Sequence, residues 1–192
     1  MQTVAAILWV FVGLAAANDS PSFLKRGSCK TGVQPLSGFD RNKFTGRWFR
    51  IGGIRNPDEE KAVKCTTLDY RVGGTGMDMV SQGLDHIDEF TRKVTPMTMD
   101  DLTVGSFGLT SNNRPVKLEI LETDYTSYAC LYSCTDIAGT HFAQFAWIMS
   151  RQPKLDKREI GLCQLALKEA GVPVGKLKGT RQDSACNYPP EE

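Results

Sequence analysis

Six cysteines are the residues of this chain whose type and number could do chemistry together. An even number of cysteines in an exported chain indicates disulfides. A zinc site is the alternative, but the chain has no Cys-x-x-Cys pair, and only His86 and His141 could add ligands. The pattern therefore favours three disulfides and predicts no metal site. The cysteines are Cys29, Cys65, Cys130, Cys134, Cys163 and Cys186.

The other residues do not form a recognisable catalytic site. Neither histidine stands in a recognisable catalytic setting, and a cysteine held in a disulfide cannot act as a nucleophile. The Gly-Gly-x-Gly stretch at 73–76 lacks the Lys-Ser/Thr pair of a phosphate-binding loop, which favours a hairpin turn. We therefore expect a protein that is not an enzyme.

The charge of the chain is nearly balanced, with 23 basic and 22 acidic residues and a formal net charge of +1. Nucleic-acid binding needs clustered lysine and arginine that displace counterions, and the sequence has no such run. The composition therefore predicts no nucleic-acid partner. A length of 192 residues suits one compact domain.

The first 17 residues have the pattern of a secretory signal peptide. Residues 4–16 carry no charge, and three alanines at 15–17 supply the small residues that signal peptidase accepts. An uncleaved anchor is the alternative, but the apolar run is shorter than the roughly 18 residues that span a bilayer. We expect cleavage after Ala17, a single domain over residues 18–192, no membrane span and an extracellular location. A glycosylation sequon begins at Asn18, and its use is left open.

Short strands separated by turn residues are predicted between Phe44 and Arg151. Gly73-Gly74 and Asn112-Asn113 are typical of hairpin turns between them. Eight such segments indicate an antiparallel meander, either closed into a barrel or folded as a sandwich. The predicted strands are Trp48–Ile54, Thr66–Val72, Met77–Gln82, Glu89–Val94, Leu102–Phe107, Val116–Leu121, Tyr128–Ser133 and Phe142–Ser150.

One helix is predicted to follow the strands. Asp156, with Glu159 three residues later, predicts its N-cap, and Gly171 predicts its end. Its apolar stripe recurs at helical spacing and must pack against the outer surface of the sheet. The stripe is Ile160, Cys163, Leu167 and Ala170.

Strand periodicity predicts one disulfide and several inward residues. Cys130 and Cys134 are four apart on a strand, so their side chains share a face, and a bridge from Cys130 to Cys163 would join the strand to the helix. The opposite face of that strand then points inward. With Asp78, Lys117 and Glu119 outward, alternation adds further inward residues. The inward candidates are Met77, Met79, Val104, Val116, Leu118, Ile120, Ala129, Leu131 and Ser133.

Three short motifs, in this order, resemble those of the lipocalin family. The Gly-Arg-Trp run at 46–48 resembles the motif that opens the first lipocalin strand. The Thr-Asp-Tyr run at 123–125 resembles the second motif, and Arg151 matches the third. This resemblance covers essentially the whole chain after the signal peptide. It implies an all-β fold, an eight-stranded antiparallel up-and-down barrel with one C-terminal α-helix packed on its outside.

Residues 121–134 are similar to the matching stretch of the crustacyanin subunits, which are carotenoid-binding arthropod lipocalins related to insecticyanin and bilin-binding protein. This similarity implies a non-covalent carotenoid such as astaxanthin and no covalent cofactor. It also implies dimers with the same or another lipocalin subunit as a candidate assembly. The implied disulfides are Cys29–Cys134, Cys65–Cys186 and Cys130–Cys163, the last agreeing with the periodicity.

The resemblance also implies roles for individual residues. Arg151 would lie on the Trp48 indole at the barrel floor. Phe145 and Trp147 are separated from Arg151 by an even number of residues, so they would share its face of the strand and point inward. The residues assigned to closing the barrel are Gly46, Trp48, Asp124, Tyr125 and Arg151. The candidate ligand-binding residues are Met77, Met79, Val104, Leu118, Ile120, Leu131, Phe145 and Trp147. Candidates for contact with polar ends of a ligand are Ser81, Gln82, Gln144 and Tyr128.

Methionine and aromatic side chains suit a long apolar or conjugated guest, because they are polarizable and adapt in shape. We therefore expect a secreted lipocalin that binds and carries a small hydrophobic ligand, a carotenoid pigment first. The alternatives are a bilin, retinoid or fatty-acid carrier of the apolipoprotein D type, a subunit whose role is structural and, as the least favoured, a cavity-based isomerase.

Overall fold

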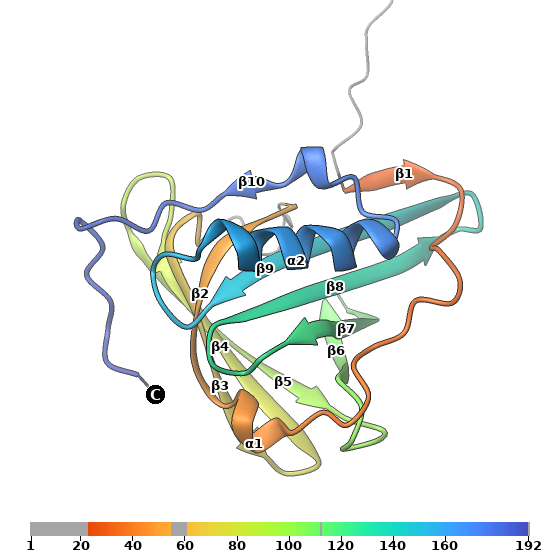
Figure 1. The fold of residues 1–192 in the computed structure, drawn as a ribbon, viewed down its shortest axis with the longest axis horizontal. Coiled ribbons are helices and arrows are strands. Elements are labelled where there is room, and N and C mark those ends of the chain that lie inside the picture. The colour runs from red at the N-terminus through yellow and green to blue at the C-terminus, as the bar shows by residue number, and fades with distance from the viewer. Residues whose placement is uncertain (1–22, 55–60, 112, 192) are drawn as a thin grey trace, which may run out of the picture.

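The computed structural model describes residues 23–54, 61–111 and 113–191 (Figure 1). The predicted signal peptide and the sequon at Asn18 lie outside these residues. No described helix is both long and apolar enough to cross a membrane. In chain order the elements are β1 Leu24–Arg26, α1 Arg41–Phe44, β2 Gly46–Gly53, β3 Lys64–Gly73, β4 Gly76–Leu84, β5 Phe90–Thr98, β6 Ser106–Ser111, β7 Arg114–Thr123, β8 Tyr128–Ile137, β9 His141–Ser150, α2 Lys157–Glu169, a 3-10 turn Val174–Lys176 and β10 Lys178–Gly179.

Strands β2 to β9 form a closed barrel. Each pairs antiparallel with the next in sequence, and β9 pairs back with β2. Two short strands extend the sheet outside the closure, β1 beside β9 and β10 beside β2. Closure removes the unpaired edges that an open sheet would expose. The eight-stranded barrel with a helix on its outside is confirmed, and the sandwich alternative is wrong.

Seven predicted strands coincide with β2, β3, β4, β5, β7, β8 and β9 apart from their ends, and the eighth is wrong in position. Strand β6 begins at Ser106 instead of Leu102, because the Asp101 carboxylate accepts hydrogen bonds from the backbone and hydroxyl of Thr103 and holds a turn. These bonds lower the pKa of Asp101. Val104 consequently lies in a connecting segment, bridged to Ser37, and its prediction as an inward strand residue is wrong.

Arg151 closes one end of the barrel, which we call the floor. Its guanidinium carbon lies 3.8 Å from the centre of the Trp48 ring. The same group donates to the carbonyls of Lys43, Arg47 and Tyr125 at 2.9–3.0 Å. These acceptors belong to α1, β2 and the turn between β7 and β8. One side chain at the end of β9 therefore joins the α1–β2 region and the β7–β8 turn, which are far apart in the sequence.

The turn before β8 is held by Asp124. Its carboxylate accepts the backbone N–H groups of residues 126, 127 and 128. Tyr125 adopts a φ of 66°, and its hydroxyl accepts the backbone N–H of Asp40 at 3.0 Å. Gly46 also has a positive φ, of 89°, and a Cβ there would lie 3.3 Å from the Arg151 guanidinium. The floor therefore needs glycine at this position.

Helix α2 packs on the outer face of β8 and β9 (Figure 1). Cys163 and Leu167 of the predicted stripe are fully buried there. Asp156 occupies the N-cap position, although its side chain makes no capping hydrogen bond. The disulfides are Cys29–Cys134, Cys65–Cys186 and Cys130–Cys163, the same pairs that the resemblance implies.

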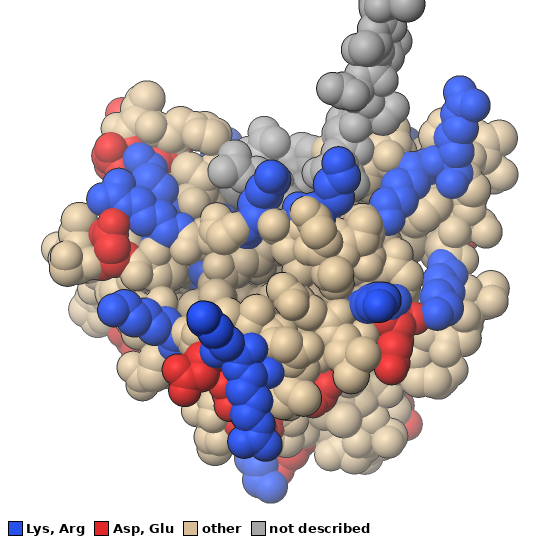
Figure 2. All heavy atoms as spheres, turned by 45° about the horizontal axis from the view of Figure 1, so that its top comes forward, with Lys and Arg blue, Asp and Glu red and all other residues tan. Residues whose placement is uncertain are grey.

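The surface agrees with the balanced composition. Figure 2 shows lysine and arginine side chains standing apart on one face, with acidic side chains among them, rather than a continuous basic surface. This face offers no extended single-sign field for a polyanion.

Replacing Arg151 with alanine should lower the free energy of unfolding by about 2–4 kcal/mol, because charge-assisted hydrogen bonds and the cation–π contact are lost together. Urea titration followed by tryptophan fluorescence measures the change. Arg158→Ala on the exposed side of α2 is the matched control and should cost less than about 0.5 kcal/mol. Equal losses in the two variants would contradict the assigned role of Arg151.

Candidate ligand-binding site

The register of β3, β4 and β5 determines which side chains face the barrel interior. Directly opposed residues of antiparallel strands share a face, so inward side chains form rows across the three strands. The row nearest the β3–β4 hairpin at the floor end is apolar, and polar groups enter towards the other end, the mouth. From floor to mouth the rows are Val72 with Met77 and Met97, Tyr70 with Met79 and Thr95, and Leu68 with Ser81 and Lys93.

A cavity of about 130 Å³ lies inside the barrel above the floor. Strands β3 to β9 all contribute to its wall, together with the segment that precedes β3. Its apolar lining is Ala62, Leu68, Tyr70, Met79, Leu109, Val116, Leu118, Leu131, Phe145 and Trp147. Its polar lining includes Lys61, Ser81, Thr91, Arg92, Lys93, Thr95, Ser111, Ser133 and Thr135.

Five of the eight candidate ligand-binding residues line this cavity. They are Met79, Leu118, Leu131, Phe145 and Trp147. Met77 and Ile120 also belong to the barrel core, but they are completely packed and are not among the lining residues. Val104 is absent from the lining, and Leu109 of β6 forms this part of the wall.

Other lining residues were not among those predicted from the sequence. Leu68 and Tyr70 could have been found, because they alternate with outward Asp69 in a strand that was predicted correctly. The inward threonines and serines carry no such signal, since hydroxyl residues are equally common on outer faces.

The predicted polar contacts are mostly outside the barrel. Ser81 lines the cavity, but Gln82 donates to Asp69, Gln144 donates to the Tyr132 hydroxyl, and Tyr128 donates to Glu122. Burial and the neighbouring Glu122 raise the pKa of Tyr128, so its phenol remains a donor. Gln144 shares parity with Ala146 and Ile148, which face α2, and alternation alone therefore places it outside.

The barrel wall is most weakly paired between β5 and β6. These strands pair only at Thr98 and Gly108, whereas β4 and β5 pair along their whole length. An open cleft of about 730 Å³ lies at this side of the barrel and shares Thr95, Leu109 and Val116 with the inner cavity. The inner cavity therefore adjoins the cleft at these residues.

The described lining is suited to binding a small molecule. It includes no histidine or cysteine, and all six cysteines of the chain are in disulfides. No group of three or more histidine, cysteine or acidic side chains within the described ranges could hold a metal ion. A largely apolar concavity with a few convergent polar groups is the usual form of a small-molecule site.

Comparisons with known proteins agree with this geometry. The model of the lipocalin / cytosolic fatty-acid binding protein family matches residues 45–182. The crustacyanin-A1 subunit of Homarus gammarus is 29% identical over 154 residues, which cover 78% of this chain and 82% of that protein. Apolipoprotein D of Mus musculus is 26% identical over 202 residues, 98% of this chain and 100% of that protein. The structure of lobster apocrustacyanin A1 superposes on this one with a TM-score of 0.73. The alignment covers 88% of this chain and 96% of the apocrustacyanin chain, at 26% sequence identity.

Filling the cavity with a larger side chain should weaken ligand binding without unfolding the barrel. Leu118→Trp should weaken the binding of an anilinonaphthalene sulfonate dye by about tenfold or more, equivalent to at least about 1.4 kcal/mol. The overpacking cost should stay below about 3 kcal/mol, because the indole can enter existing space. Dye fluorescence and thermal denaturation measure the two effects. Leu165→Trp on the exposed side of α2 is the control, and equal dye binding in both variants would contradict the site.

Proposed function

Because this chain belongs to the lipocalin / cytosolic fatty-acid binding protein family, we propose that it carries a small hydrophobic ligand non-covalently inside its barrel. The observation that carries the proposal is the apolar cavity above a closed floor. A guest in this cavity is removed from water on every side except the mouth and the neighbouring cleft.

The energetics of burial support a carrier that needs no covalent bond. Each CH₂-sized group removed from water contributes roughly 0.8 kcal/mol, against the cost of association and ordering. Trp147, Phe145 and Met79 present aromatic and thioether surface to the guest. Such surface adapts to a conjugated or branched chain better than rigid aliphatic packing.

A carotenoid such as astaxanthin is the first candidate ligand, because the chain is similar to crustacyanin subunits in both sequence and fold. The second candidate class is a bilin, retinoid or fatty acid, in keeping with the match to apolipoprotein D over 98% of the chain. Both classes use the same cavity and require no catalytic residue. The protein is therefore proposed to bind and transport its ligand, and not to act as an enzyme.

The proposal places the protein outside the cell, after removal of residues 1–17. Three disulfides support this location, because oxidising compartments form and preserve them. A dimer with the same or another lipocalin subunit is the proposed assembly, in line with the relatives that are named as subunits.

Titration with astaxanthin should quench tryptophan emission, because Trp147 lines the cavity while Trp48 lies in the floor. Trp147→Phe should lose most of the quenching and retain binding measured by absorbance. Mass spectrometry of organic extracts of the native protein identifies the resident molecule. If no carotenoid, bilin, retinoid or fatty acid alters the emission or is found in the extract, the carrier proposal is wrong.

A further inference from the structure

Helix α2 presents one side to the barrel and the opposite side to solvent. Figure 1 shows the helix lying across the outside of the barrel, with β8 and β9 behind it. Cys163 and Leu167 are fully buried on the inner side. The helical period of 3.6 residues therefore turns Gly161 and Leu165 to the outer side, where Leu165 is 56% exposed.

Gly161 has no evident role within a single chain. It is the fifth residue of a helix of 13 residues, so it does not end the helix, and its φ is not positive. A Cβ built at this position would meet no side chain or neighbouring segment of the described structure within 4 Å. Glycine inside a helix lowers its stability relative to alanine. A glycine that one chain does not need is explained by the close approach of a second molecule.

Opposite charges flank this apolar centre on the same outer side. Arg158 lies in the first turn of α2 and Glu169 at its last residue, about 16 Å apart along the axis. Neither side chain forms an ion pair within the described residues. If a second, identical helix lies antiparallel, Arg158 of each copy lies beside Glu169 of the other. Gly161 of each copy then faces Leu165 of the other.

We propose that two copies of this chain form a dimer through the outer stripe of α2, which consists of Arg158, Gly161, Leu165 and Glu169. The two helices are antiparallel and related by a two-fold axis, so each contact occurs twice. Leu165 of one copy occupies the hollow over Gly161 of the other. The inference rests on the proposed dimer, for which it names the surface and the partner, and it does not depend on the ligand. One helix from each copy makes a small interface, so we expect a weak dimer.

Sedimentation velocity of the oxidised mature protein, over a range of micromolar concentrations, should show an equilibrium between monomer and dimer. Leu165→Asp should raise the dissociation constant of the dimer by about tenfold or more, because a carboxylate would lose its water at the centre of the contact.

Gly161→Gln separates a role in the dimer from a role in the fold. Glutamine is a better helix former, so the melting temperature of the monomer should rise by about 1–4 °C. The dissociation constant should nevertheless rise by about tenfold, because the new side chain occupies the position of the partner's Leu165. A merely structural glycine would not give these two opposite effects.

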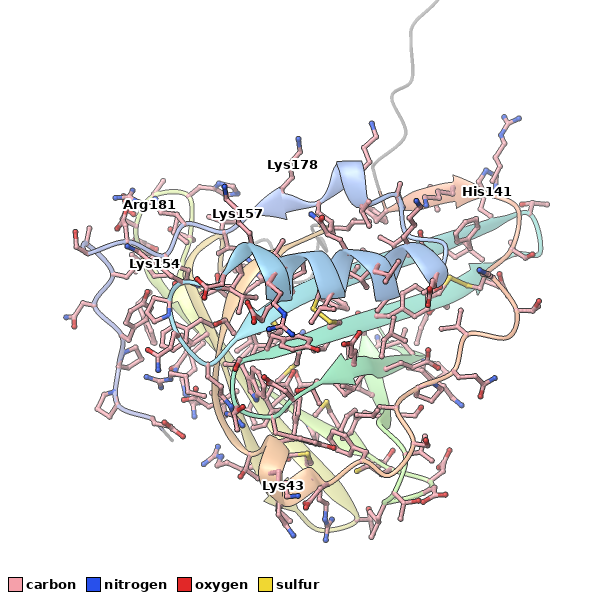
Figure 3. The ribbon with its side chains drawn as sticks, viewed as in Figure 1. Lys43, His141, Lys154, Lys157, Lys178 and Arg181 are labelled. Carbon is pink, nitrogen blue, oxygen red and sulfur yellow. A yellow bond between two sulfur atoms is a disulfide. The ribbon has the colours of Figure 1, made fainter. Side chains whose placement is uncertain are left out.

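Charge exchange tests the antiparallel arrangement. Arg158→Glu and Glu169→Arg should each raise the dissociation constant about threefold to tenfold, since two ion pairs become repulsive, and salt should reduce this effect. Both changes suit the helix dipole, so the fold should not suffer. The double variant should restore the dissociation constant to within about twofold. Lys43→Glu is the control, because it makes the charge change of Arg158→Glu on α1, which Figure 3 shows far from α2.

Each outcome decides a separate point. A wild-type protein that remains monomeric overturns the inference. A dimer that none of the variants weakens overturns the α2 surface and leaves the proposed dimer standing. Weakening by Leu165→Asp without restoration by the double charge exchange overturns the antiparallel arrangement. Astaxanthin titration of the same variants tests the carrier function separately, because the stripe lies outside the barrel, and circular dichroism confirms that each variant is folded.

Discussion

The closed floor is the constraint on which the rest of the molecule depends. A barrel of eight strands has an interior that side chains can either fill or leave open. Here the floor half is filled by an aromatic cluster in which Phe44 stacks on Trp48 with ring centroids 5.0 Å apart, and the Arg151 guanidinium lies over the Trp48 ring. Because Arg151 also donates hydrogen bonds to three backbone carbonyls, the floor does not rely on apolar packing alone. The upper half is therefore free to remain hollow.

A hollow core has an energetic cost that must be offset elsewhere. At about 24 cal/mol per Å³, an empty cavity of about 130 Å³ costs on the order of 3 kcal/mol. The three disulfides can offset a cost of this size, since each contributes typically about 2–4 kcal/mol. They fasten the N-terminal segment, α2 and the C-terminal tail to the outside of the barrel wall. The cross-links thus stabilise the container without occupying its interior.

Much of this arrangement could be predicted because alternation along a strand is a strict geometric rule. The rule gave the inward position of Leu131, the outward position of Cys130 and hence the bridge to Cys163. It failed where a local turn competes with the strand, as at Asp101, whose carboxylate holds Thr103 and delays β6. Register between strands is a second level that alternation along one strand does not reveal. Only pairing shows that Ser81, Lys93 and Thr95 face one cavity together.

The polarity of the cavity follows from the same closure. With Arg151 and the aromatic cluster sealing one end, a guest can enter only from the mouth or the β5–β6 side, so its leading part meets the apolar wall. Leu118, Leu131 and Trp147 form apolar contacts with the leading part of the guest. The hydroxyl and ammonium groups of the lining lie nearer the part that enters last. The sealed floor therefore determines the direction from which a guest enters the apolar cavity.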